Sequence, residues 1–157
     1  MRKTILLASL ILVVSSVVPA QALTGSHGEI LKVSKTTAIK SGDKLVVSGQ
    51  RFDETIGIYV ALCTLVKAGT LPSPCGGGID ESGATGASIW ISSNPPPYGQ
   101  GLAIPFAPGG RFAEDVAITR KIGKFDCRKV KCAITVRSDH LHEGDRSHDI
   151  YIPITIK

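Results

Sequence analysis

Polar and apolar residues alternate along several short stretches of this chain, and the clearest stretch closes it. Every second residue from 150 to 156 is isoleucine, with Tyr151, Pro153, Thr155 and Lys157 at the remaining positions. Because successive side chains of a β-strand point to opposite faces, this pattern predicts a strand with one buried face. Pro153 has no amide hydrogen to donate, so we expect this strand at a sheet edge or at a bulge.

The stretch from Ile56 to Val66 is largely apolar at both sets of alternating positions. A strand of this kind is expected at the centre of a sheet, where both faces are covered. Shorter runs with the same alternation lie at 29–33, 44–48, 88–92, 112–118 and 132–136. About seven short strands separated by turn residues are typical of an antiparallel β-sandwich, so we predict one all-β domain.

The chain begins with a pattern typical of export. Arg2 and Lys3 precede the uncharged stretch 4–18, and residues 19–22 read PAQA. This pattern predicts a secretory signal peptide over residues 1–22, cleaved after Ala22. The remaining residues, 23–157, suffice for a single domain with its own core. We therefore expect a protein that is secreted or associated with the cell envelope, with no membrane-spanning segment in the mature chain.

The four cysteines form two close pairs along the sequence. Cys63 and Cys75 are one pair, and Cys127 and Cys132 are the other. An even number of cysteines at such spacing in an exported chain predicts two local disulfides. Paired cysteines supply no thiol nucleophile, and the chain has no serine-elbow, zinc-helix or phosphate-loop motif. We therefore expect a protein that is not an enzyme.

Charge adds a weaker indication. Without Arg2 and Lys3, the chain holds 16 basic and 13 acidic residues, a net charge of +3. Six of the basic residues cluster between Arg120 and Lys131. Such a cluster is either a solvated surface or a contact for anionic polymers or lipid headgroups. It lacks the interleaved aromatic residues of a single-strand nucleic-acid platform, so the sequence carries no strong nucleic-acid signal.

Residues 139–149 contain three of the four histidines, at positions 140, 142 and 148. In an extended backbone His140 and His142 share a side, and a third ligand would complete a zinc or copper site. Axial ligation of haem by His140, His142 or Tyr98 is a second reading. A polar hairpin loop with internal carboxylate–arginine pairs is the simpler interpretation, and we predict no metal ligand.

Several apolar residues are candidates for a ligand cleft: Leu65, Trp90, Tyr98 and Phe106. A single tryptophan in a sandwich is usually a core residue, which is the alternative for Trp90. Tyr98 follows three consecutive prolines, which favour an extended, stiff backbone. An aromatic side chain exposed on a rigid loop is a common recognition anchor.

Three segments resemble the neocarzinostatin family of secreted apoproteins: residues 44–52 (KLVVSGQRF), 57–63 (GIYVALC) and 126–132 (DCRKVKC). The resemblance covers roughly residues 30 to 157 and implies a seven-stranded immunoglobulin-like sandwich. It also implies a cleft beside the two disulfides, near Leu65 and Ala133. Leu65 occupies a position at which the chromophore carriers of the family can place a large aromatic side chain. Segments 90–96 and 145–149 are closer to neocarzinostatin-like modules of actinobacterial envelope proteins.

The sequence thus predicts a secreted binding module of the actinobacterial envelope or exterior. A loop rim made rigid by Cys63–Cys75 and Cys127–Cys132 would recognise an envelope component, and we expect a monomer. The alternative is a carrier that sequesters an enediyne-like chromophore or haem in the cleft. For that carrier, the resemblance implies antimicrobial activity directed at DNA.

Overall fold

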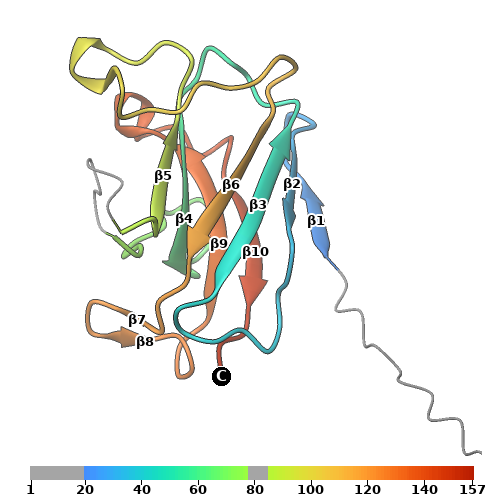
Figure 1. Ribbon diagram of the computed structural model, residues 1–157, viewed down its shortest axis with the longest axis vertical. Helices are drawn as coiled ribbons and strands as arrows, with labels where there is room; N and C mark the ends of the chain where they lie inside the picture. The colour runs from blue at the N-terminus through green and yellow to red at the C-terminus, as the bar shows by residue number, and fades with distance from the viewer. Residues whose placement is uncertain (1–19, 78–84) are drawn as a thin grey trace, which may run out of the picture.

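The computed structural model describes residues 20–77 and 85–157, and these form two antiparallel sheets that face each other (Figure 1). The first sheet has the order β1-β2-β3-β6, made of Gln21–Thr24, Ile30–Val33, Lys44–Gln50 and Phe112–Ala117. The second has the order β10-β9-β4-β5, made of Ile150–Ile154, Cys132–Ser138, Ile58–Thr64 and Ser88–Ile91. The predicted all-β antiparallel sandwich is confirmed.

Short elements occupy the two ends of the sandwich. A small hairpin pairs β7 (Lys121–Ile122) with β8 (Phe125–Asp126), at the lower end in Figure 1. Two single-turn 3-10 helices, η1 (Pro97–Gly99) and η2 (His140–His142), lie toward the opposite end. The strands therefore separate two groups of loops.

The strands agree closely with the alternation in the sequence. β4 lies inside its sheet between β9 and β5, as its two apolar faces predicted. β10 is an edge strand, with Pro153 paired to Ala133, as the missing amide donor of proline predicted. Ile118, just after β6, is buried on the side of Phe112 and Val116.

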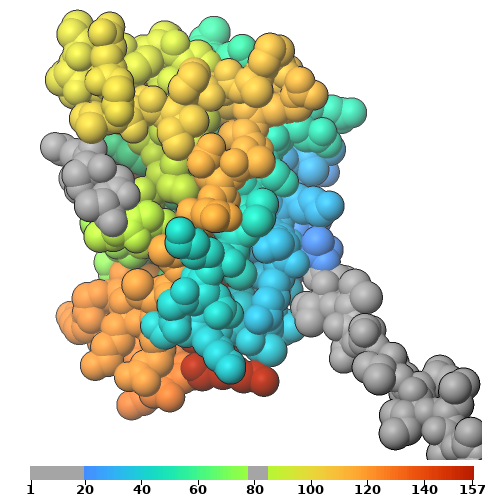
Figure 2. Space-filling view, viewed as in Figure 1, coloured from blue at the N-terminus to red at the C-terminus, as the bar shows by residue number. Residues whose placement is uncertain are grey.

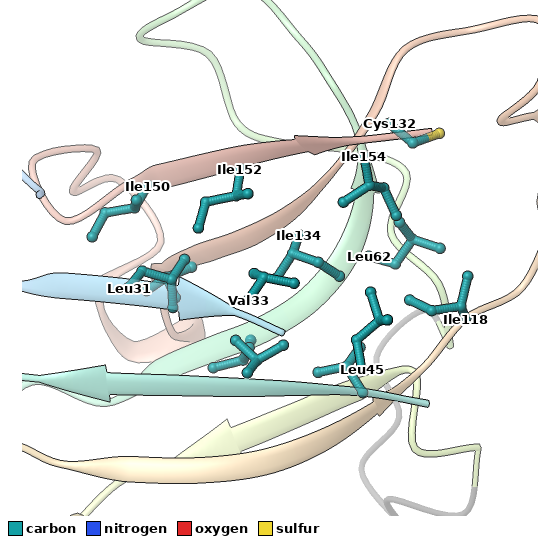
Figure 3. Packing of buried hydrophobic residues seen from close by; sticks show 14 of the residues in the cluster. Leu31, Val33, Leu45, Leu62, Ile118, Cys132, Ile134, Ile150, Ile152 and Ile154 are labelled. Atoms are coloured by element: carbon teal, nitrogen blue, oxygen red, sulfur yellow. The ribbon is translucent and has the colours of Figure 1, made fainter. Parts of the chain in front are cut away.

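The core lies between the two sheets (Figure 3). Leu31 and Leu45 from the first sheet pack toward Leu62, Ile134 and Ile152 from the second, and each is at most 2% exposed. Burying a side chain of this size contributes about 1.5–3 kcal/mol. The aliphatic core therefore supplies the stability on which the loops at both ends depend.

The structure differs from the sequence reading in four strands. β3 continues through Gly49 to Gln50, whereas the alternation suggested an end near Ser48. A Cβ at Gly49 would lie 2.1 Å from the Phe112 ring and 2.6 Å from the Phe52 ring, so this glycine makes room for packed aromatic rings. β1 and the β7–β8 hairpin were not anticipated, because each is too short to show a period.

Most of the predicted signal peptide falls outside the described residues. Residues 1–19 of the predicted signal peptide lie outside them. The predicted cleavage after Ala22 falls within β1, which pairs with β2 through Leu23↔Leu31 and Thr24↔Ile30 among others. Among the described residues, no helix is both long and apolar enough to cross a membrane.

Both predicted disulfides are present. Cys63 is bonded to Cys75 and Cys127 to Cys132. The first joins the end of β4 to the segment beside it, and the second closes the loop between β8 and β9. Disulfides are typical of proteins that mature in an oxidising compartment, which is consistent with export.

Candidate functional site

Four ring-bearing side chains from separate elements meet at the upper end of the second sheet. Tyr59 of β4 and Trp90 of β5 are direct cross-strand partners, so their rings lie on the same outer face. Tyr98 comes from η1, and His140 comes from η2 immediately after β9. We call the cluster of Tyr59, Trp90, Tyr98 and His140 the aromatic pole.

His140 is the centre of the aromatic pole. Its Nδ1 lies 2.6 Å from the Tyr59 hydroxyl, and its Nε2 lies 2.8 Å from the Tyr98 hydroxyl. The Trp90 ring contacts it edge-on at 5.1 Å between centroids, and the two tyrosine rings lie at 6.0 Å. One imidazole therefore links η1 to the sheet through both of its nitrogens.

A buried carboxylate fixes the position of this imidazole. Asp139 is 0% exposed and accepts hydrogen bonds from Trp90 Nε1 at 3.0 Å and from the Leu141 amide at 3.0 Å. The second bond caps the start of η2. A Cβ at Gly57 would lie 1.9 Å from Asp139 Oδ2, so only glycine leaves space for the carboxylate. Asp139 thus ties β5 and η2 together beneath the rings.

Tyr98 is the part of the aromatic pole that faces solvent. Its side chain is 62% exposed, although its hydroxyl is held by His140. The neighbouring Gly99 packs on the indole of Trp90, where a Cβ would lie 2.4 Å from Cη2. Trp90 itself is half-buried. The sequence predicted an exposed aromatic on a stiff, extended loop. Tyr98 is exposed as predicted, but Pro97–Gly99 form the 3-10 turn η1, and only the backbone before it at Pro96 is extended.

The other predicted ligand-binding residues lie elsewhere. Phe106 is 7% exposed and packs with Phe52 and Phe112, both at 6.3 Å between ring centroids, so it belongs to the core. Leu65 is half-buried just beyond β4, where its amide donates to Lys131 O at 2.8 Å. Ala133 has no exposed surface and pairs with Cys63. The structure therefore brings together only Trp90 and Tyr98 of the predicted set.

Sequence reasoning did not identify Tyr59, Asp139 and His140 as one site. Tyr59 and His140 are 81 positions apart, and only the pairing of β4 with β9 brings them together. The sequence alone groups His140 with His142 and His148 in one stretch, and there a metal site is one possible interpretation. The one feature of the sequence that points toward this site is the alternation that places Tyr59 and Trp90 at outward positions of their strands.

A charged network continues from the aromatic pole along the outer face of β9 and β10. The Arg137 guanidinium carbon lies 5.3 Å from the centroid of the Tyr59 ring. Arg146 pairs with Asp149 at 3.2 Å, and Asp149 accepts from the Tyr151 hydroxyl at 2.8 Å. Burial raises the pKa of both Asp149 and Tyr151 above their ordinary values.

The third histidine of the stretch lies in a separate cluster. His148 Nδ1 is 2.8 Å from the buried Glu29 carboxylate, and the ring of His27 stacks on it at 4.7 Å. Burial alone would raise the pKa of Glu29, but hydrogen bonds from backbone amides and from His148 hold that pKa below its ordinary value. The cluster ties the β1–β2 turn to the loop before β10.

The three histidines of the stretch 139–149 therefore have separate hydrogen-bonding partners and do not converge on one point. His142 Nδ1 lies 3.4 Å from Asp139, while His140 and His148 belong to the two clusters described above. Within residues 20–77 and 85–157, no group of three or more His, Cys, Asp or Glu side chains is arranged to hold a metal ion. The polar-loop interpretation accounts for these contacts.

A shallow groove lies on the opposite side of the molecule, on the outer face of the first sheet. Its volume is about 530 Å³, and Lys32, Ser48, Gln50, Arg111 and Ala113 are among the residues that line it. None of the residues that the sequence singled out for a ligand cleft lines this groove.

No family model and no curated protein matches this sequence. Among solved structures, macromomycin, a neocarzinostatin-family chromoprotein, superposes with a TM-score of 0.51 at 14% sequence identity. The alignment covers 82% of this chain and 99% of macromomycin. At this identity the likeness concerns the fold alone. The chain has a distant neocarzinostatin-like fold.

Proposed function

We propose that this protein is a secreted, non-enzymatic binding module of the cell envelope or exterior, which recognises its partner through the aromatic pole. The observation that carries the proposal is Tyr98, whose ring is 62% exposed while its hydroxyl is fixed by His140 at 2.8 Å. An exposed aromatic ring held in one position loses little conformational freedom on binding. Such residues dominate the affinity of many interfaces.

The surroundings of Tyr98 suit recognition. Leu102, shortly after η1, is 45% exposed, and Leu141, within η2, is 50% exposed. Buried Asp139 holds Trp90 and η2 in place beneath this surface. A rigid, partly apolar surface with hydrogen-bonding groups around it resembles the centre of a typical interface.

The proposal is tested by comparing variants made in the cells that secrete the protein. Native mass spectrometry should detect a bound species on the wild-type protein and its loss from Tyr98→Ala. Val46→Ala is the matched control, because Val46 is 49% exposed on the outer face of the first sheet. A bound species that remains on Tyr98→Ala, or its absence from the wild type, would contradict the proposal.

Macromomycin is a chromophore-carrying apoprotein, so the fold is compatible with the carrier reading as well. Carriage of a chromophore or haem beside the disulfides requires space near Leu65 and Ala133. Ala133 of β9 is 0% exposed, and Ala61 of β4, on the same face of the second sheet, is 4% exposed, so this part of the sheet is covered. We therefore favour recognition at the surface. A coloured protein with a tightly bound small molecule would favour the carrier.

A further inference from the structure

The end of the sandwich opposite the aromatic pole gathers three segments that are far apart in the sequence. The Arg120 amide donates to Ser41 Oγ at 3.1 Å, and the Gly42 amide donates to Ile118 O at 2.8 Å. The Lys157 amide donates to Ile39 O at 2.8 Å. Residues 35–44, 118–131 and 155–157 therefore form one surface, which we call the basic pole; Figure 2 shows these segments in cyan, orange and red meeting at its lower end.

Charge at the basic pole is strongly one-sided. Its three segments contain ten lysine and arginine residues and only two acidic residues, Asp43 and Asp126. The two carboxylates pair with Lys35, Arg120 and Arg128 at 3.2–3.5 Å. In the described parts of the chain, no salt bridge engages Lys121, Lys124, Lys129 or Lys131, and all four side chains are exposed. The sequence showed only the cluster at 120–131; folding adds Lys40, Lys44 and Lys157.

These charges are held on ordered backbone. The Cys127–Cys132 disulfide closes the loop that carries Arg128, Lys129 and Lys131. The Cys127 amide donates to Arg120 O at 2.9 Å, which anchors that loop to the β7–β8 hairpin. Keeping like charges close together destabilises a fold, so this concentration of charge carries a stability cost that a binding function would explain.

We propose that the basic pole is a docking surface for an anionic polysaccharide, a linear glycan that carries repeated carboxylate, sulfate or phosphate groups. Charge complementarity is the basis of the proposal. Several exposed lysines over one surface can contact successive anionic groups of a polymer, and binding releases the counterions that surround it. This surface lies at the other end of the strands from Tyr98 and does not depend on the function of the aromatic pole.

Two other anionic partners fit the surface less well. Insertion into a bilayer needs exposed apolar side chains, and the large exposed ones among the described residues lie outside the three segments. A single-stranded nucleic acid needs aromatic rings for its bases to stack on. Phe125 is the only aromatic residue of the three segments, and it is half-buried with Lys124 Nζ 5.6 Å from its ring centroid.

The test uses heparin, a sulfated linear glycan, and two variants with the same change in net charge. Lys121→Gln/Lys124→Gln/Lys129→Gln removes three charges from the basic pole. Lys32→Gln/Arg51→Gln/Arg111→Gln removes three exposed charges from outside it. Heparin affinity is measured by calorimetry from low to high salt, and melting temperatures confirm that both variants fold.

We expect the basic-pole variant to lose on the order of tenfold or more in heparin affinity at about 0.1 M salt, with a smaller salt dependence. The control variant should stay within about threefold of the wild type, since only its long-range attraction changes. Equal losses in the two variants would show attraction by net charge alone and would overturn the proposal.

Two further probes identify the class of partner. Duplex DNA and vesicles of phosphatidylglycerol are titrated with the wild-type protein under the same salt conditions. The proposal predicts that heparin binds more tightly than either probe. Tighter binding of the DNA would assign the surface to nucleic acid, and tighter binding of the vesicles would assign it to a lipid membrane. Either result would overturn the polysaccharide assignment.

Discussion

The aromatic pole and the basic pole sit at opposite ends of the same strands and are built in contrary ways. At the aromatic pole, buried Asp139 and the two nitrogens of His140 all have short-range partners. At the basic pole, exposed lysines repel one another, and a disulfide and a small hairpin hold them in place. Hydrogen bonds and ring packing fix the shape of the aromatic pole. The basic pole is instead characterised by the long-range electrostatic field of its lysines and arginines.

The loops around the two poles also differ in charge. The segments at the aromatic end, 25–29, 51–57, 92–111 and 139–149, contain seven carboxylates and three arginines. The basic pole has the reverse imbalance. The modest net charge of the chain therefore hides a strong separation of charge along the molecule, which orients it in the field of a charged partner.

The largest effect is expected from removing the carboxylate beneath the aromatic pole. Asp139→Ala would leave the partly buried indole N–H of Trp90 and the Leu141 amide without their acceptor. We expect a loss of about 3 kcal/mol in the free energy of unfolding, measured by denaturant titration. Asp139→Asn, which keeps one acceptor oxygen, should lose less. A change below about 0.5 kcal/mol in Asp139→Ala would show that Asp139 does not support this pole.

Opening the second disulfide should loosen the basic pole. Cys127→Ser/Cys132→Ser removes the closure of a short loop, and the chain-entropy estimate for such a loop is about 2 kcal/mol. Because the loop holds like charges, part of the loss should be recovered at high salt, where charges are screened. Thermal unfolding at low and high salt measures both effects. A salt response equal to that of the wild type would contradict the role of repulsion.

Removing only the hydroxyl of Tyr98 separates its two roles. Tyr98→Phe keeps the exposed ring but loses the bond to His140. The expected stability loss is about 0.5 kcal/mol, since the site is open to water. Partner binding should weaken less than in Tyr98→Ala. If Tyr98→Phe abolishes binding while Tyr98→Ala only weakens it, the ring is not the recognition element.

The smallest effect concerns acid titration at the basic pole. Hydrogen bonds from the Arg128 side chain and amide lower the pKa of Asp126 from 3.8 to about 2. A carboxylate whose pKa is depressed on folding stabilises the fold above its unfolded pKa, and this contribution disappears as the pH falls from about 4 to about 2. An NMR titration of the Asp126 carboxyl carbon checks this shift. Arg128→Gln should move the midpoint upward, and an unchanged midpoint would assign the shift to another group.

The strands were largely predictable because they depend on local alternation. The isoleucines of β10 and the apolar faces of β4 gave both strand type and position in the sheet, and Pro153 gave the edge. The cysteine spacing gave both disulfides. β1 and the β7–β8 hairpin were missed because elements of two to four residues carry almost no periodic signal.

The sites were less predictable because they depend on contacts between distant segments. The exposure of Tyr98 followed from the rigidity of its prolines, which is a local property. Its bond to His140 requires η1 and η2 to meet above β4 and β5, and no local pattern encodes that. Phe106 looks like a cleft residue in the sequence, but Gly49 opens a space in which Phe52, Phe106 and Phe112 pack as core.

The seven-residue strands β3, β4 and β9 set the separation between the two ends. At about 3.3 Å per residue, each holds its first and last residues roughly 20 Å apart. A large molecule seated at one end would therefore leave the other end accessible. The sandwich is thus a spacer of fixed length between the two surfaces proposed here for binding.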